Sequence, residues 1–235
     1  MQPDLVLLRD LIEASPTITA WRRGLPEAEI SAVEAAAGPL PTSFRWWLAE
    51  FGGGAVGGAP LATAGLPDVD LVPRGDRLTF LIDEDEYAFA LDRRSGGECP
   101  VVRRDHFTGE EDDFADTFAG FLTVRAALAA GLRDGPNPTI ARLWRSTPGV
   151  LLPDGTTVYG PHDLPERNAT FEVRRYAPDW TLVGDDGGGN GLFMRHHGRD
   201  RASVHLLDLG AIERDVAAVA EPVTDDLLAW LAART

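Results

Sequence analysis

One segment of this sequence has residue types that could bind a ligand, the run GDDGGGNG at residues 184–191. Glycine lets backbone amides approach a phosphate closely, and the carboxylates of Asp185 and Asp186 could hold a cation. The run lacks the Lys-Ser or Lys-Thr pair of a P-loop, and it lacks the alternating ligands and closing Glu of an EF-hand. A β-turn with a solvated acidic tip is therefore the favoured interpretation.

Other patterns that resemble catalytic or cofactor motifs fail in their context. Glycines at residues 52–57 satisfy GxGxxG, but they follow a predicted helix, whereas a dinucleotide site needs a preceding strand. His196 and His197 would point to opposite faces of a regular strand, so they would not share one ion there. Cys99 is the only cysteine and shows no signature of a nucleophile. We therefore expect no catalytic residue, no metal and no cofactor.

Acidic runs and one aromatic side chain are the candidates for binding a protein partner. The chain has 22 Lys plus Arg against 37 Asp plus Glu, a formal net charge of -15. Such a charge repels nucleic acid and anionic membranes and complements a basic protein, although general solubility explains it equally well. The candidate partner-binding residues are Asp83, Glu84, Asp85, Glu86, Glu110, Glu111, Asp112, Asp113, Asp185, Asp186 and Trp46. Their alternative interpretations are solvated turns and, for Trp46, core packing.

The elements predicted for the first half place both acidic runs in turns. Apolar stripes indicate helices near residues 5–12, 30–37 and 41–51, the last ending at Gly52 as a C-cap. The glycine-rich residues 52–60 are expected to form a loop with little to pack. Strand-like runs at residues 78–82, 87–91 and 101–102 then predict an antiparallel meander. A helix is predicted to follow at residues 114–131.

A second half follows DGPNP at residues 134–138, where the helical pattern breaks. It is predicted to hold a hairpin at Asp154-Gly155, further strands and a closing helix with Leu227 and Leu231. Its pattern matches the first half at offsets of 102 to 109 residues. We expect an α+β fold, a twisted antiparallel sheet packed against helices and duplicated, with domains at residues 1–135 and 148–235 and a linker at 136–147.

Residues 30–54, ISAVEAAAGPLPTSFRWWLAEFGGG, resemble the front signature of the SUKH superfamily, which includes the fungal Smi/Knr cell-wall regulators and many bacterial immunity proteins. The resemblance continues through YAFALD, CPVVRRDH and DFADTFAGFL, and in the second half through ERNATFEV, residues 180–194 and VHLLDLG. It implies an α+β fold that binds proteins, with bacterial members neutralising a secreted polymorphic toxin. DEDE replaces the family's glycine-containing acidic turn, and the second half lacks the front helices.

These observations lead to three hypotheses. The main one is an immunity protein that binds and occludes a basic toxin domain, and the alternative is an intracellular scaffold or regulator of the same superfamily. The third is an enzyme or metal-binding protein that uses Asp185 and Asp186. The N-terminus lacks a signal peptide and no segment is apolar enough to span a membrane, so we expect a cytoplasmic protein. The oligomeric state stays open.

Overall fold

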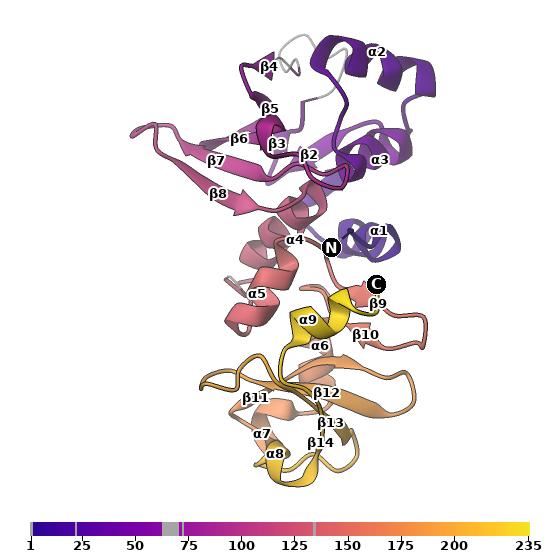
Figure 1. Cartoon of the computed structure of the whole chain (residues 1–235), viewed down its shortest axis with the longest axis vertical. Coiled ribbons are helices and arrows are strands. Elements are labelled where there is room, and N and C mark those ends of the chain that lie inside the picture. The colour runs from indigo at the N-terminus through magenta and orange to yellow at the C-terminus, as the bar shows by residue number, and fades with distance from the viewer. Residues whose placement is uncertain (1, 22, 63–70, 72, 134) are drawn as a thin grey trace.

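The computed structural model of the chain describes residues 2–21, 23–62, 71, 73–133 and 135–235. In these residues helices accompany antiparallel sheets, which confirms the α+β class. Figure 1 shows the first half of the chain above the second, with α4 (Phe118–Ala129) and α5 (Pro138–Trp144) between them. The first residue of the predicted break, at position 134, lies outside the described residues.

The predicted N-terminal helices are α1 (Leu5–Ala14), α2 (Glu27–Ala37) and α3 (Thr42–Phe51). Helix α3 buries Phe44, Trp47 and Leu48, the apolar stripe seen in the sequence. Gly52 has a φ of 76° and its amide donates to the carbonyl of Leu48. Because this left-handed conformation favours glycine, Gly52 ends the helix as predicted.

The glycine-rich segment after α3 forms strands, so the prediction of a loop with little to pack is wrong. Strand β1 (Ile18–Ala20) pairs with β2 (Gly54–Val56), and β2 pairs with β3 (Ala59–Pro60). A Cβ on Gly54 would lie 2.2 Å from the carbonyl oxygen of Thr19. Glycine here therefore allows the two backbones to approach, which a sequence pattern alone does not reveal.

A five-stranded meander follows in the described residues: β4 (Pro73–Arg74), β5 (Arg77–Ile82), β6 (Asp85–Ala90), β7 (Val101–Asp105) and β8 (Glu111–Ala115). The short helix η1 (Leu91–Arg93) joins β6 to β7. One face of the sheet packs on α3 and α4 through aromatic rings. Phe80 stacks on Phe89 at 4.3 Å between centroids, and Phe44 meets Phe118 edge-on at 4.9 Å. These rings form the centre of the first hydrophobic core.

The second half builds a separate, curled sheet, whose described strands run in the order β14-β13-β12-β11-β10-β9. Its elements are β9 (Val150–Leu151), β10 (Thr157–Val158), α6 (Leu164–Thr170), α7 (Val173–Tyr176), β11 (Trp180–Asp185), β12 (Asn190–Arg195), β13 (Val204–Asp208), α8 (Val216–Val219), β14 (Glu221–Thr224) and α9 (Leu227–Ala232). Strands β9 and β10 form the hairpin predicted around Asp154-Gly155. A second hydrophobic core lies against this sheet.

Helix α5 occupies the segment expected to be a linker at residues 136–147. Asn137 caps it by accepting hydrogen bonds from the amides of Thr139 and Ile140, both at 3.0 Å, and Pro138 is its first residue. Proline in a first turn has no amide to leave unpaired, so Asn-Pro begins a helix here. The buried side chains of Ile140 and Trp144 join the second core, and the segment is therefore folded structure.

The two meanders share irregularities at matching places. The register shifts between Thr79 and Leu81 in the first sheet and between Leu182 and Gly184 in the second, 103 residues later. Another pair of shifts begins at Val101 and at Val204, again 103 residues apart. β-bulges are specific features of a strand pair. Their correspondence favours a duplication, which stays a prediction.

Backbone contact between α4 and α5 joins the halves. A Cβ on Gly120 would lie 1.7 Å from the carbonyl oxygen of Arg145, so only glycine permits this approach. The same carbonyl accepts the Asp116 amide at 2.7 Å, and the Thr117 hydroxyl donates to the carbonyl of Ser146 at 2.7 Å. These bonds fix the end of α5 against the start of α4.

A buried carboxylate holds the start of α3. Glu98, only 5% exposed, accepts hydrogen bonds from the Ser43 amide at 2.8 Å and the Ser43 hydroxyl at 2.9 Å. Burial raises the pKa of Glu98 above its ordinary value of 4.5, although both bonds oppose the shift. The ionised form is therefore disfavoured in the folded protein relative to the unfolded chain.

Replacing Glu98 with Gln should make folding stability less dependent on pH. Because the folded-state pKa is raised, the contribution of protonated Glu98 is complete below pH 4.5 and is lost as pH rises through the raised pKa. The free energy of unfolding of Glu98→Gln, minus that of the wild type, should therefore increase with pH above 4.5. Urea denaturation across this range tests it. Glu84→Gln, at an exposed residue, is the control, and a constant difference for Glu98→Gln would contradict the prediction.

Candidate functional site

The β7–β8 hairpin carries the most exposed large apolar side chain of the described residues. Phe107, in its turn, is 97% exposed. Figure 1 shows this hairpin projecting away from the body of the molecule. An aromatic ring in water at the tip of a projecting element is a candidate anchor for a partner protein, since aromatic residues are enriched among binding hot spots.

The turn that presents Phe107 is held by Asp105. Its carboxylate accepts hydrogen bonds from the amides of Phe107 at 2.8 Å and Thr108 at 2.7 Å, and its carbonyl accepts the amide of Gly109 at 2.9 Å. These backbone donors keep the pKa of the Asp105 carboxyl below its usual value, with the Thr108 amide contributing most. Gly109 has a φ of 72°. The tip is therefore preorganised, which reduces the ordering needed when a partner binds.

The acidic runs are largely incorporated in strands, so their prediction as turns is wrong in most positions. Asp83 and Glu84 form the turn between β5 and β6, but Asp85 and Glu86 begin β6. Glu111, Asp112 and Asp113 lie in β8, and Glu110 precedes it. Charged residues are common in edge strands, where they discourage pairing with other chains. Strand β8 is such an edge.

Arginines of β5, η1, β7 and α4 engage most of these carboxylates. Arg103 pairs with Asp112 at 2.7 Å and lies 3.8 Å from Asp85. Arg77 pairs with Glu111 at 2.7 Å, and Arg93 pairs with Asp113 at 2.6 Å. The hydrogen bond from Arg93 lowers the pKa of the Asp113 carboxyl. Glu86 accepts the hydroxyl of Thr79. These side chains brace the sheet instead of standing free for a partner.

The ion pairs also cover small apolar residues on the outer face of the sheet. Ala88, Ala90 and Val102 are buried there in a cluster separate from the two main cores. Register pairs Ala88 with Val102 and Val102 with Asp113, and side chains on one face alternate along a strand. The small side chains leave room for the long stems of Arg77 and Arg93 to lie across them. Glu111 and Asp113 thus have a structural use that the sequence did not reveal.

Of the carboxylates in the two runs, Glu84, Glu86 and Glu110 form no ion pair among the described residues, and Glu86 is partly buried. Glu84 is exposed at the β5–β6 turn, and Glu110 is exposed beside the Phe107 turn. Arg104 is also exposed, and its guanidinium lies near Gly109. The tip therefore combines an apolar ring with charges of both signs.

Trp46 is partly buried. Its ring meets Phe51 edge-on at 5.6 Å between centroids, and it packs against the first core. Of the two roles predicted for Trp46, core packing accounts for most of its side chain. The part that stays exposed lies on α3 and not on the β7–β8 hairpin.

Asp185, the last residue of β11, and Asp186, the first residue after it, both bind the backbone of the β11–β12 turn. The Asp186 carboxylate accepts the amides of Gly188 at 2.8 Å and Asn190 at 2.9 Å and the side-chain amide of Asn190 at 2.6 Å. Asp185 accepts the Gly187 amide at 2.9 Å and the hydroxyl of Tyr159. These contacts match the turn interpretation, and burial together with Asp185 raises the pKa of Tyr159.

The adjacent histidines lie in the second half of the chain, whereas the cysteine lies in the first core. His196 and His197 follow the end of β12, with ring centroids 6.1 Å apart, and His196 contacts the hydroxyl of Thr181. Cys99 is buried in the first core, where burial raises its thiol pKa. Within the described ranges, no group of three or more His, Cys, Asp and Glu side chains could hold a metal ion.

No protein-family model matches the chain. Each helix that the structure describes is too short or too polar to cross a membrane.

Phe107 was not among the residues predicted from the sequence to bind a partner, because the prediction relied mainly on acidic runs. The segment DHFTGE around it has the composition of an ordinary polar turn. The available signal was an aromatic residue between Asp105 and Gly109, two residues typical of turns. A phenylalanine in a turn has few neighbours to cover it, so its exposure could have been inferred from the turn itself.

The two acidic residues of the β5–β6 turn should differ in their effect on stability. Asp83 pairs with Arg125 at 2.8 Å, with side chains only 18% and 20% exposed, and Arg125 also donates to the Tyr87 hydroxyl at 3.0 Å. Asp83→Asn should lower the free energy of unfolding by about 1–2 kcal/mol, because it leaves a half-buried guanidinium without its counter-ion. The exposed-site control Glu84→Gln should change it by less than about 0.5 kcal/mol. Equal effects in urea denaturation would contradict this assignment.

Proposed function

We propose that this chain is a binding protein of the SUKH type that neutralises a basic bacterial toxin in the cytoplasm by direct contact. It acts by occlusion, without turnover and without a cofactor. The toxin-binding element is the β7–β8 hairpin, with Phe107 as its anchor.

The exposure of Phe107 carries this proposal. An apolar ring that is 97% exposed contributes nothing to the packing of its own chain. Buried in a pocket of a partner, a phenylalanine side chain contributes about 2 kcal/mol of binding free energy. The turn held by Asp105 already has a fixed backbone, so little of this gain is lost to ordering.

Charge supports a basic partner. The formal net charge is -15, and of the candidate acidic residues Glu84 and Glu110 remain exposed without an ion pair in the described part of the chain. A basic toxin surface would be attracted by the overall field, and Glu110 would stand beside the bound ring. Complementary charge of this kind mainly raises the association rate.

The test begins with a tagged full-length chain purified together with the product of the neighbouring gene. Association of the purified pair is then measured for the wild type, Phe107→Ser and Tyr176→Ser. Tyr176 is 43% exposed on α7 in the second half and serves as a matched exposed aromatic. Phe107→Ser should weaken binding about thirtyfold, the equivalent of about 2 kcal/mol, and Tyr176→Ser should not change it.

The toxin's activity provides the second measurement. Wild type and Tyr176→Ser should abolish it at equal concentration, whereas Phe107→Ser should fail at concentrations where the wild type succeeds. Binding with the same affinity by wild type and Phe107→Ser would reject the hairpin as the site. A partner without toxic activity would reject neutralisation in favour of a scaffold or regulatory role.

A further inference from the structure

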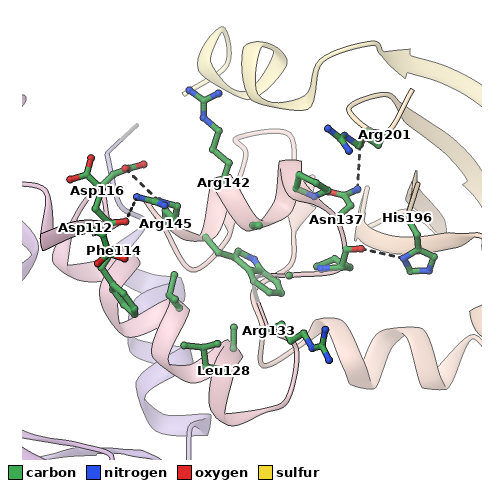
Figure 2. Close-up of a pocket in the computed structure, with 18 of the residues that line it drawn as sticks. Asp112, Phe114, Asp116, Leu128, Arg133, Asn137, Arg142, Arg145, His196 and Arg201 are labelled. Carbon is green, nitrogen blue, oxygen red and sulfur yellow. Dashed lines mark hydrogen bonds and ion pairs between the residues drawn. The ribbon is translucent and has the colours of Figure 1, made fainter. Parts of the chain in front are cut away.

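A groove of about 1010 Å³ runs between the two halves of the chain, below the β7–β8 hairpin. Strand β8 and helix α4 form one side, and α5 and the segment after β12 form the other. Figure 2 shows Asp112, Asp116 and Arg145 at one end and Arg201 and His196 at the other. Such a hollow at the junction of two packed units is a common position for a binding site.

Part of the lining of the groove is apolar. Val124 and Leu128 of α4 and Ala141 of α5 line it. Leu128 is 46% exposed, which makes it one of the larger apolar side chains left in water. This surface is suited to an aliphatic or aromatic side chain of a ligand.

The carboxylates of the groove already have partners. Asp112 pairs with Arg103 at 2.7 Å, and Asp113 pairs with Arg93 at 2.6 Å. Asp116 accepts the Ser146 hydroxyl at 2.8 Å and lies 3.9 Å from Arg145. Their negative charges are therefore largely compensated within the chain.

Three arginines of the groove, Arg133, Arg142 and Arg201, are in the opposite situation. All three are exposed, and none forms an ion pair with a described carboxylate. Asp200, next to Arg201, pairs with Arg195 at 3.1 Å. Figure 2 shows the Arg142 side chain extending away from α5 and Arg201 beyond the start of that helix, near Asn137. The groove therefore presents uncompensated positive charge in a chain whose net charge is -15.

We propose that this groove binds an acidic, amphipathic segment of a protein, with apolar side chains on the α4–α5 surface and carboxylates at Arg142 and Arg201. A bidentate guanidinium–carboxylate pair suits these arginines. The apolar surface favours a peptide over single-stranded nucleic acid, which binds through stacking on exposed aromatic rings. The rings of Phe114 and Trp144 in this groove are packed into the cores. This site is separate from the hairpin tip and does not depend on its function.

The test uses a fluorescein-labelled synthetic peptide in which a pair of leucines is flanked by glutamates. Its fluorescence anisotropy is measured with the full-length wild type and with the double variant Arg142→Glu, Arg201→Glu. The control double variant Arg174→Glu, Arg214→Glu makes the same charge change at exposed arginines elsewhere in the second half. The wild type and the control should bind the peptide equally, and the groove variant should bind about tenfold more weakly.

Additional variants and a control peptide distinguish binding in the groove from binding at other sites. Leu128→Asp should also weaken binding, while Phe107→Ser should leave it unchanged, so failure here is distinct from failure of the toxin-binding proposal. A matching peptide with lysines in place of glutamates should not bind. The proposal is overturned if the acidic peptide does not bind the wild type, if both double variants bind it alike, or if a single-stranded RNA binds in its place. Thermal unfolding of each variant verifies the fold.

Discussion

The absence of a side chain at Gly120 determines how the two halves of this chain meet. With the carbonyl of Arg145 only 1.7 Å from where a Cβ would lie, α4 and α5 touch backbone to backbone. Residues of both helices line the groove between the halves, so this contact joins its two sides. Any larger residue would displace α5, whose Ile140 and Trp144 belong to the second core. One glycine thus couples the packing of the second half to the shape of a surface feature.

The distribution of charge also depends on small side chains. Small residues on the outer face of the first sheet allow Arg77 and Arg93 to lie flat and reach carboxylates of β8. The charged groups cover apolar atoms and protect an edge strand. A run of acidic residues in the sequence therefore does not imply an acidic surface. Consecutive side chains of a strand point to opposite faces of the sheet, where they pair with different arginines.

Patterns that depend on near neighbours in sequence were predictable. The stripe of α3 and its glycine cap, the meander and the hairpin around Asp154-Gly155 all follow from local periodicity and turn chemistry. Features that depend on distant partners were not. The strand at Gly54 requires the approach of Thr19, and the placement of Asp112 in β8 requires Arg103 across the strand pair. The prediction at Asn137-Pro138 was wrong for a different reason. The proline was interpreted as the end of a helical pattern, whereas it begins α5. Of the predicted partner-binding residues, the structure leaves Glu84 and Glu110 exposed without ion pairs in its described part, and it adds Phe107.

The succession of the two cores along the chain bears on biosynthesis. The first core is drawn from residues 8–126 and the second from residues 127–231, without interleaving. As the polypeptide leaves the ribosome, every strand of the first meander has its neighbours before the second is translated. Domains generally fold as units in the order of their synthesis. Contacts between the halves, such as the hydrogen bond from the Asp4 amide to the Thr147 hydroxyl at 3.2 Å, form after the later residues are synthesised. The nascent first half therefore hides its aromatic rings early, which shortens the period in which it is vulnerable to aggregation.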